Sequence, residues 1–80
     1  MDETKVFDTS QIEEELIKNT LYEVFEILEE RGYNPVEQMA GYLISGDPGY
    51  ITSHKEARNK IIKFDRNHIL EVILKSYVKR

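Results

Sequence analysis

Apolar residues recur through most of the chain at the spacing of a helix. The first such stretch opens after Ser10, which forms a capping box with Glu13 three residues later. Gly32 is a typical residue just beyond a helix end. The pattern therefore predicts a helix over about residues 11–31. Its apolar face consists of Ile17, Leu21, Val24 and Leu28, widened by Tyr22 and Phe25.

A second helix is predicted in the middle of the chain. Asn34 and Pro35 indicate its start, because asparagine caps helices and proline fits the first helical position. Gly46 ends it, and a turn-rich connector follows over residues 45–50. Its apolar face consists of Val36, Met39, Ala40, Leu43 and Ile44.

A third, basic helix is predicted over about residues 54–63. Ser53 and Glu56 form a second capping box at its start. Its apolar side consists of Ala57, Ile61, Ile62 and Phe64.

The last helix is predicted over about residues 66–79, with Asp65 as its cap. Its apolar band covers two neighbouring rows, 69-73-77 and 70-74-78. A helix that packs on one side of a core needs only one apolar stripe, and a chain of 80 residues has a thin core. We therefore expect the second row to contact either the first helix or a second copy of the chain, and favour the second copy.

These patterns predict an all-α fold, a compact bundle of four to five short helices over residues 10–80. Residues 1–9 show no helical periodicity and carry Asp2, Glu3 and Asp8, so we interpret them as a flexible N-terminal arm. We expect the bundle to form a homodimer, because small domains often gain stability by association.

Charge is distributed unevenly between the two halves of the chain. Residues 1–47 carry 12 acidic and 3 basic side chains, a balance of −9. Residues 48–80 carry 3 acidic and 8 basic side chains, a balance of +5, and the whole chain carries −4. Such asymmetry can hold two halves of a fold together or present two faces to two partners. Solvated helix faces of opposite sign are the simpler interpretation.

Several classes of protein are disfavoured by the composition. The chain has no cysteine, so it forms no disulfide and offers no thiolate to a metal. Its acidic N-terminus lacks the apolar run of a signal peptide, and no stretch approaches the ~20 apolar residues of a membrane span. We expect a cytoplasmic protein without membrane insertion.

Catalytic and metal-binding spacings are missing from the sequence. His54 and His68 are the only histidines and fall on different predicted helices, so we expect neither a metal nor a cofactor. Ser45, Asp47 and His54 would supply the residue types of a hydrolytic triad, but Ser45 does not lie in a Gly-x-Ser-x-Gly elbow. We therefore expect no enzymatic activity.

A basic patch offers an alternative function. Lys55, Arg58, Lys63 and Arg66 would suit a small DNA-binding module. However, the connector over residues 45–50 is longer than the usual turn of a helix-turn-helix motif, and a net acidic protein is repelled by the phosphate backbone. We therefore expect no nucleic-acid partner, and interpret Lys55, Arg58 and Lys63 as a protein-binding face.

The central block carries a long and specific motif. It contains Gly32-Tyr33-Asn34-Pro35, then Gln38 and Gly41-Tyr42, and then Ser45-Gly46-Asp47-Pro48. With Tyr50-Ile51 and Ala57-Arg58-Asn59, this block resembles the IreB/ReoM family of small regulatory phosphoproteins from Gram-positive bacteria. One departure is Thr52-Ser53, where the family usually has Pro-Arg.

The resemblance implies a homodimeric helical protein that is phosphorylated by a membrane-anchored, PASTA-domain Ser/Thr kinase. It also implies an influence on peptidoglycan synthesis and cephalosporin tolerance, in some members through turnover of the enzyme MurA by Clp protease. The family's phosphorylated threonine lies in a context like Asp-Glu-Thr-x-x-Phe. The segment Asp2-Glu3-Thr4-Lys5-Val6-Phe7 fits this context, so the resemblance makes Thr4 the expected phosphorylation site, with Thr9 as its rival.

Overall fold

A computed structural model of the chain describes residues 9–79. These residues form four α-helices and two short 3₁₀ helices, with no β-strand among them, which confirms the all-α prediction. The elements in chain order are α1 (Thr9–Glu30), α2 (Pro35–Ser45), η1 (Pro48–Tyr50), η2 (His54–Glu56), α3 (Ala57–Ile61) and α4 (Arg66–Lys79).

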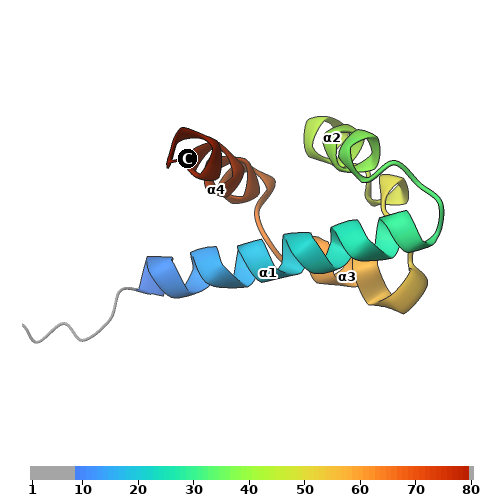
Figure 1. The fold of residues 1–80 in the computed structure, drawn as a ribbon, viewed down its shortest axis with the longest axis horizontal. Coiled ribbons are helices and arrows are strands. Elements are labelled where there is room, and N and C mark those ends of the chain that lie inside the picture. The colour runs from blue at the N-terminus through green and yellow to red at the C-terminus, as the bar shows by residue number, and fades with distance from the viewer. Residues whose placement is uncertain (1–8, 80) are drawn as a thin grey trace, which may run out of the picture.

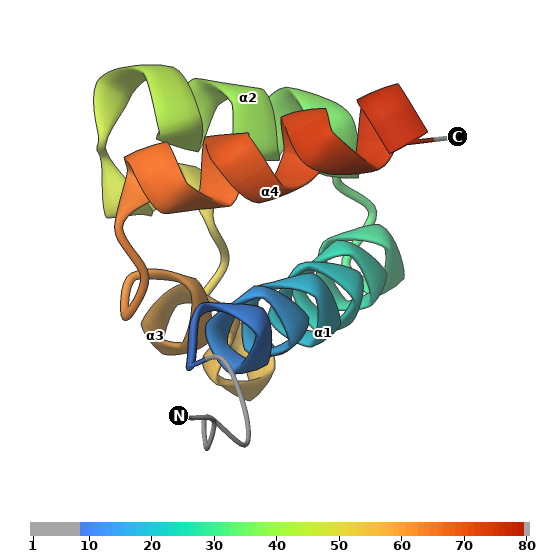
Figure 2. The ribbon, with the colours of Figure 1, turned by 90° about the vertical axis from the view of Figure 1, so that its left-hand side faces the viewer.

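The long helix α1 supports the other helices. α2 and α4 both run across the same side of α1 and stand apart from each other, as Figure 1 shows. The helices form two layers, with α1 and α3 side by side in one layer and α2 and α4 in the other. Figure 2 shows α1 and α3 as a lower pair beneath α2 and α4. The upper pair therefore leaves part of α1 uncovered between its two helices.

The core lies where the two layers meet. All four α-helices contribute to it, and so does Ile51, which follows η1. Burial of this set supplies most of the driving force for folding, because apolar area leaves water when the layers come together. The buried residues are Ile17, Val24, Ile27, Leu28, Met39, Tyr42, Ile51, Ala57, Ile61, Ile69 and Val72.

The turn between α1 and α2 follows directly from its residues. Gly32 has a positive φ of 85°, which glycine adopts without steric cost. The N–H of Gly32 donates to the carbonyl of Glu29 (3.0 Å), and the N–H of Tyr33 donates to that of Leu28 (2.9 Å). This pair of bonds is the Schellman arrangement that ends helices. The predicted boundary at residue 31 is therefore correct to within one residue.

The start of α1 differs from the sequence-based expectation. α1 begins at Thr9, so Ser10 is its second residue rather than its cap, and the predicted capping box of Ser10 and Glu13 is wrong. Thr9 belongs to the helix, whereas Thr4 and the rest of the predicted arm lie outside the described residues.

The predicted basic helix over residues 54–63 is broken in two. Ser53 makes no side-chain capping bond, and α3 proper spans only Ala57–Ile61. Lys55 and Glu56 adopt left-handed backbone angles, with φ of 52° and 64°. Such angles are costly for residues other than glycine, so the packing of the neighbouring segments holds them in place. The capping box of Ser53 and Glu56 is therefore wrong as well.

α2 begins and ends as expected, but turns a different face to the core. Asn34 accepts a hydrogen bond from the N–H of Glu37 (3.1 Å), and Gly46 closes the other end with a φ of 79°. Met39 and Tyr42 are the buried residues, whereas Val36 and Ile44 are 65% and 84% exposed. Three of the five residues of the predicted apolar face, Val36, Ala40 and Ile44, are therefore exposed.

Candidate protein-interaction surface

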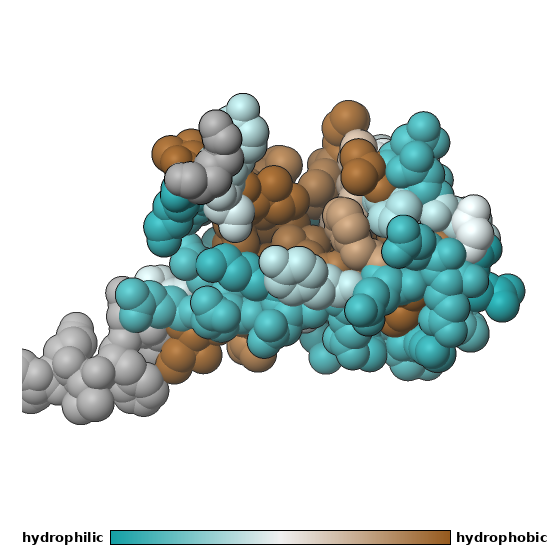
Figure 3. All heavy atoms as spheres, viewed as in Figure 1, coloured by the Kyte–Doolittle hydropathy of each residue, from teal (hydrophilic) through white to brown (hydrophobic). Residues whose placement is uncertain are grey.

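An open apolar trough runs between α2 and α4, with α1 as its floor. Figure 3 shows apolar side chains gathered in the hollow between these two helices. Leu43 of α2 and Leu70 of α4 line the same hollow at one end, and Val36 lies two turns before Leu43 on the same face of α2. We define the trough by five apolar residues that line it and by three exposed apolar residues of α2 and α4. The lining residues are Leu21, Phe25, Leu43, Leu70 and Ile73, and the exposed ones are Val36, Ile44 and Leu74.

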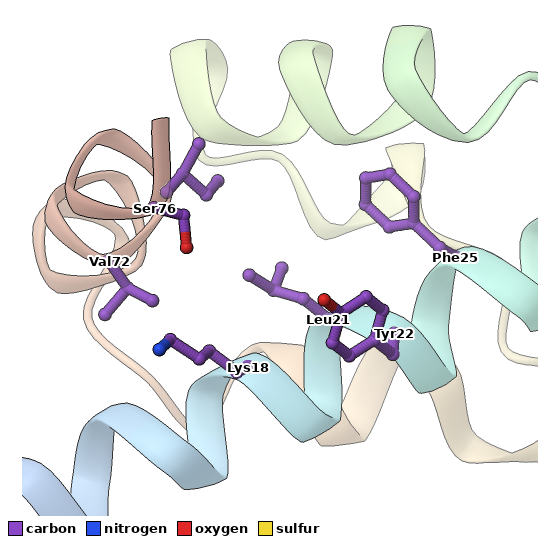
Figure 4. A pocket seen from close by; sticks show the side chains of 7 residues that line it. Lys18, Leu21, Tyr22, Phe25, Val72 and Ser76 are labelled. Atoms are coloured by element: carbon purple, nitrogen blue, oxygen red, sulfur yellow. The ribbon is translucent and has the colours of Figure 1, made fainter. Parts of the chain in front are cut away.

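One part of the trough is a groove between α1 and α4. It encloses about 230 Å³. Figure 4 shows Lys18 and Leu21 on α1 facing Val72 and Ser76 on α4 across this groove. Because most of the lining is apolar, the groove fits apolar side chains of a partner rather than a charged ligand. The lining residues are Lys18, Leu21, Tyr22, Phe25, Val72, Ile73 and Ser76.

One wall of the trough is formed by α4, whose apolar band is wider than its contact with the core. α4 packs on the core through Ile69 and Val72, and Val72 belongs to neither predicted row. The row 70-74-78 stays exposed, with Leu74 at 59% and Val78 at 78% exposure. α2 likewise has more apolar residues than its contact with the core uses, because Val36 and Ile44 of its predicted apolar face are exposed. Exposed apolar surface of this extent marks an interaction site.

Arg58, which was predicted to belong to the partner-binding face, forms hydrogen bonds within the fold. It is half-buried, and its Nε donates hydrogen bonds to the carbonyl oxygens of Ile51 (2.8 Å) and Pro48 (3.1 Å). Arg58 thus ties the start of α3 to the connector that carries the buried Ile51. Its neighbours in the predicted binding face, Lys55 and Lys63, are exposed.

The motif residues build the same connector. The side-chain amide of Gln38 donates to the carbonyl of Tyr50 (2.8 Å), and a Cβ at Gly41 would lie only 2.4 Å from the Tyr50 ring. Ser45 Oγ donates to the carbonyl of Gly41 (2.7 Å), and Asp47 Oδ1 accepts from the N–H of Gly49 (2.8 Å). These motif residues therefore hold the connector that follows α2 against α2 itself.

Ion pairs join the acidic α1 to the basic second half of the chain. Lys55 pairs with Glu30 (3.0 Å) and Lys60 with Glu23 (2.9 Å), both on α1. Glu14 accepts a hydrogen bond from Lys75 of α4. The charge asymmetry of the sequence thus holds the two halves of the fold together.

Two of these carboxyl groups, those of Glu14 and Glu30, have a lowered pKa. The hydrogen bond from Lys75 lowers the pKa of Glu14 below its ordinary value of 4.5, against an opposing effect of burial. The hydrogen bond from Lys55 lowers the pKa of Glu30 in the same way. Both pairs face solvent, which screens them, so each stabilises the fold modestly.

Acid is therefore expected to weaken the fold through these two carboxylates. A carboxyl group with a lowered folded-state pKa stabilises the fold above its unfolded-state pKa, and this contribution is lost as the pH falls through the lowered value. Urea unfolding between pH 7 and pH 3 should show stability declining below about pH 4.5. The decline should be shallower in the Glu14→Gln, Glu30→Gln double variant. An equally steep decline in that variant would contradict the assignment.

The four basic residues of the DNA-binding alternative do not form one free cationic surface. Lys55 and Arg58 are engaged as described, and Arg66 Nη1 donates to the carbonyl of Leu43 (3.0 Å). Lys63 is the member of this set without an ion pair or hydrogen bond among residues 9–79. A phosphate backbone would meet one available cation here, which argues against this alternative.

Among residues 9–79, no three His, Asp or Glu side chains come together in a way that could hold a metal ion. His68 Nδ1 lies 3.7 Å from a carboxylate oxygen of Glu13. His54 is the first residue of η2, whereas His68 belongs to α4. The helices of this part are also too short or too polar to cross a membrane.

A comparison with known proteins agrees with these features. The family model described as IreB regulatory phosphoprotein matches residues 2–79. The match covers the helical domain and extends into the segment that contains Thr4. The chain therefore belongs to the IreB family of regulatory phosphoproteins.

Proposed function

We propose that this protein is a phosphorylation-controlled adaptor or inhibitor that works by binding other proteins and catalyses no reaction. The observation that carries the proposal is the apolar trough between α2 and α4, on a domain whose family consists of regulatory phosphoproteins. A trough of this kind fits a protein surface, because aliphatic and aromatic side chains make up most of its groove between α1 and α4.

A second copy of the chain is the proposed occupant of the trough. The exposed residues of α4 and α2 lie in two nearly parallel helices, a geometry that suits the same pair of helices from another subunit. A homodimer would cover residues such as Ile44 and Val78, which are about four-fifths exposed in the single chain. Burial of this surface would compensate for the thin core of an 80-residue chain.

The proposed control is phosphorylation of Thr4 by a PASTA-domain Ser/Thr kinase. The proposed setting is the cytoplasm, where the protein would modulate peptidoglycan synthesis and cephalosporin tolerance. MurA and components of Clp protease are the proposed partners through which it acts. The family resemblance of residues 2–7 and of the central motif supports these assignments.

The proposed partner face includes the basic residues around α3. Lys63 is exposed and has no ion pair among residues 9–79, so it can contact a partner directly, whereas Lys55 would exchange its ion pair with Glu30 for such a contact. Arg58 would support this face by holding the connector, since its Nε is already bonded to two carbonyl groups.

Phosphate labelling tests the proposed control. Incubation with the catalytic domain of a PASTA-domain kinase and ATP should label the wild-type chain, and Thr4→Ala should remove most of the label. Thr9→Ala is the matched control and should keep it, because Thr9 is the first residue of α1 while kinases bind extended segments. Loss of label in Thr9→Ala alone would move the site to Thr9. No label in any of the three proteins would contradict phosphorylation by this class of kinase.

A further inference from the structure

Two consecutive residues form a left-handed turn just before α3. Lys55 has φ and ψ of 52° and 30°, and Glu56 has 64° and 20°. Among residues 9–79, these two are the residues other than glycine that have a positive φ. This region is unfavourable for a residue with a Cβ, and lysine and glutamate are both good formers of right-handed helix. The turn therefore opposes the preference of its own residues.

The local sequence favours a right-handed start of α3 at this point. Ser53 and Glu56 have the spacing of a capping box, yet Ser53 makes no side-chain capping bond. In a regular helix the N–H of Arg58 would donate to the carbonyl four residues back. It donates instead to the carbonyl of Thr52 (3.0 Å), six residues back. The left-handed turn thus stands where the first turn of a longer α3 would be.

Tertiary contacts hold the turn in its left-handed form. On one side, the Nε of Arg58 donates to the carbonyl of Ile51 (2.8 Å). On the other side, Lys55 forms its ion pair with Glu30 of α1 (3.0 Å). Ile51 and Ala57, which flank the turn in sequence, are both fully buried. The chain must therefore cross between two fixed points, and the left-handed turn is the path that it takes.

We propose that residues 53–56 form a two-state turn, which is left-handed while Arg58 is bound to the connector and becomes the first turn of α3 once Arg58 is released. In the released form the N–H of Arg58 would donate to the carbonyl of His54, and Ser53 would cap the lengthened helix. The backbone hydrogen bond is exchanged rather than lost, and the strain of two left-handed residues is relieved. This gain offsets part of the cost of breaking the bonds of Arg58.

The two-state turn would connect a partner at the α3 face to the rest of the fold. This step rests on the proposed function, in which that face meets another protein. A carboxylate of the partner would compete with the carbonyl of Ile51 for the guanidinium of Arg58, because charged acceptors bind it more strongly. Release would free the connector, which contacts α2 through the bond between Gln38 and Tyr50. Binding at α3 would thereby act on α2.

Alanine and glycine at position 56 report the handedness of the turn. Both substitutions remove the carboxylate of Glu56, which accepts a hydrogen bond from Asn59 (2.7 Å), so the comparison isolates the backbone preference. Glycine adopts a positive φ without steric cost, whereas alanine favours a right-handed helix. Glu56→Gly should therefore have the higher Tm, by about 5 °C for a domain of this size. In an Arg58→Ala background the order should reverse, because the released turn is helical.

Glu26 provides the matched control. It is an exposed glutamate in the middle of α1 with ordinary helical backbone angles. Glu26→Ala should therefore have a higher Tm than Glu26→Gly, with Arg58 intact or replaced.

Nuclear Overhauser effects between the amide proton and the Hα within residues 55 and 56 give a second readout, because they are strong at positive φ. They should be strong in the wild type and weak in Arg58→Ala. If Arg58→Ala is unfolded, Arg58→Lys, which keeps one of the two bonds, should still weaken them.

Two results would overturn the proposal. A higher Tm for Glu56→Ala than for Glu56→Gly in the otherwise wild-type chain would show that the turn is already right-handed. A preference for glycine that persists after Arg58 is replaced, with the strong amide-to-Hα effects retained, would show that Arg58 does not control the turn. Neither measurement uses a partner or a kinase, so failure of the two-state turn is distinguishable from failure of the proposed function.

Discussion

Replacing Leu74 with glutamate is expected to convert a dimer into a folded monomer. Leu74 stands in the middle of the exposed row on α4 and is 59% exposed in the single chain. In the proposed dimer it would be buried, and a buried carboxylate without a partner costs about 3–5 kcal/mol. Since 1.4 kcal/mol is a factor of ten, the dissociation constant should rise by roughly 100-fold or more.

Sedimentation at micromolar concentration measures this change. The wild type should sediment at twice the 9.4 kDa chain mass, and the Leu74→Glu protein at the chain mass. Asn19→Glu is the matched control, because it adds the same charge to an exposed position of α1 that is outside the trough. The circular dichroism of all three proteins should remain helical. A wild-type chain that is a stable monomer would refute the dimer, and a dimer that survives Leu74→Glu would place its interface elsewhere.

Helix boundaries were predictable where a local signal set them. The ends of α2 follow from Asn34, Pro35 and Gly46, and the end of α1 follows from Gly32, because capping and turn chemistry act within a few residues. The start of α1 was missed, since Ser10 and Glu13 have the spacing of a capping box although Ser10 already lies inside the helix.

The division of apolar positions between core and trough was not predictable from periodicity. A helical period identifies which residues share a face, but it does not say which part of a broad face meets a neighbour. Val36 and Ile44 were therefore predicted to share one apolar face with Met39, although Met39 is buried and the other two are exposed. The unusual width of the apolar face, on α2 as on α4, was the sign of a second surface.

The role of Arg58 also depended on tertiary structure. Its charge and its place in a basic stretch predicted a contact for a partner. The bonds to Ile51 and Pro48 come from folding the connector back over α3, which nothing within residues 54–63 encodes. Lys55 and Lys60 show the same effect, because their partners Glu30 and Glu23 lie 25 and 37 residues away in the chain.

Replacing Arg58 with alanine is expected to destabilise the fold itself. The substitution removes two hydrogen bonds from a charged donor, and the carbonyl of Ile51 would lose its partner at a half-buried position. Hydrogen bonds to charged groups contribute about 1.5–3 kcal/mol each, so we expect a loss of about 2 kcal/mol of unfolding free energy after partial solvation. For a domain of this size that corresponds to a fall of about 10 °C in Tm.

Thermal unfolding of three variants separates this structural role from partner binding. Arg58→Lys should recover part of the loss, because an ammonium group can still donate to one carbonyl but lacks the geometry of the guanidinium. Lys63→Ala removes a nearby exposed charge and should change the unfolding free energy by less than about 0.5 kcal/mol. If Arg58→Ala instead keeps the wild-type Tm and loses partner binding, Arg58 contacts the partner directly. In that case the two carbonyl bonds contribute little to stability, and the connector is held by the burial of Ile51 alone.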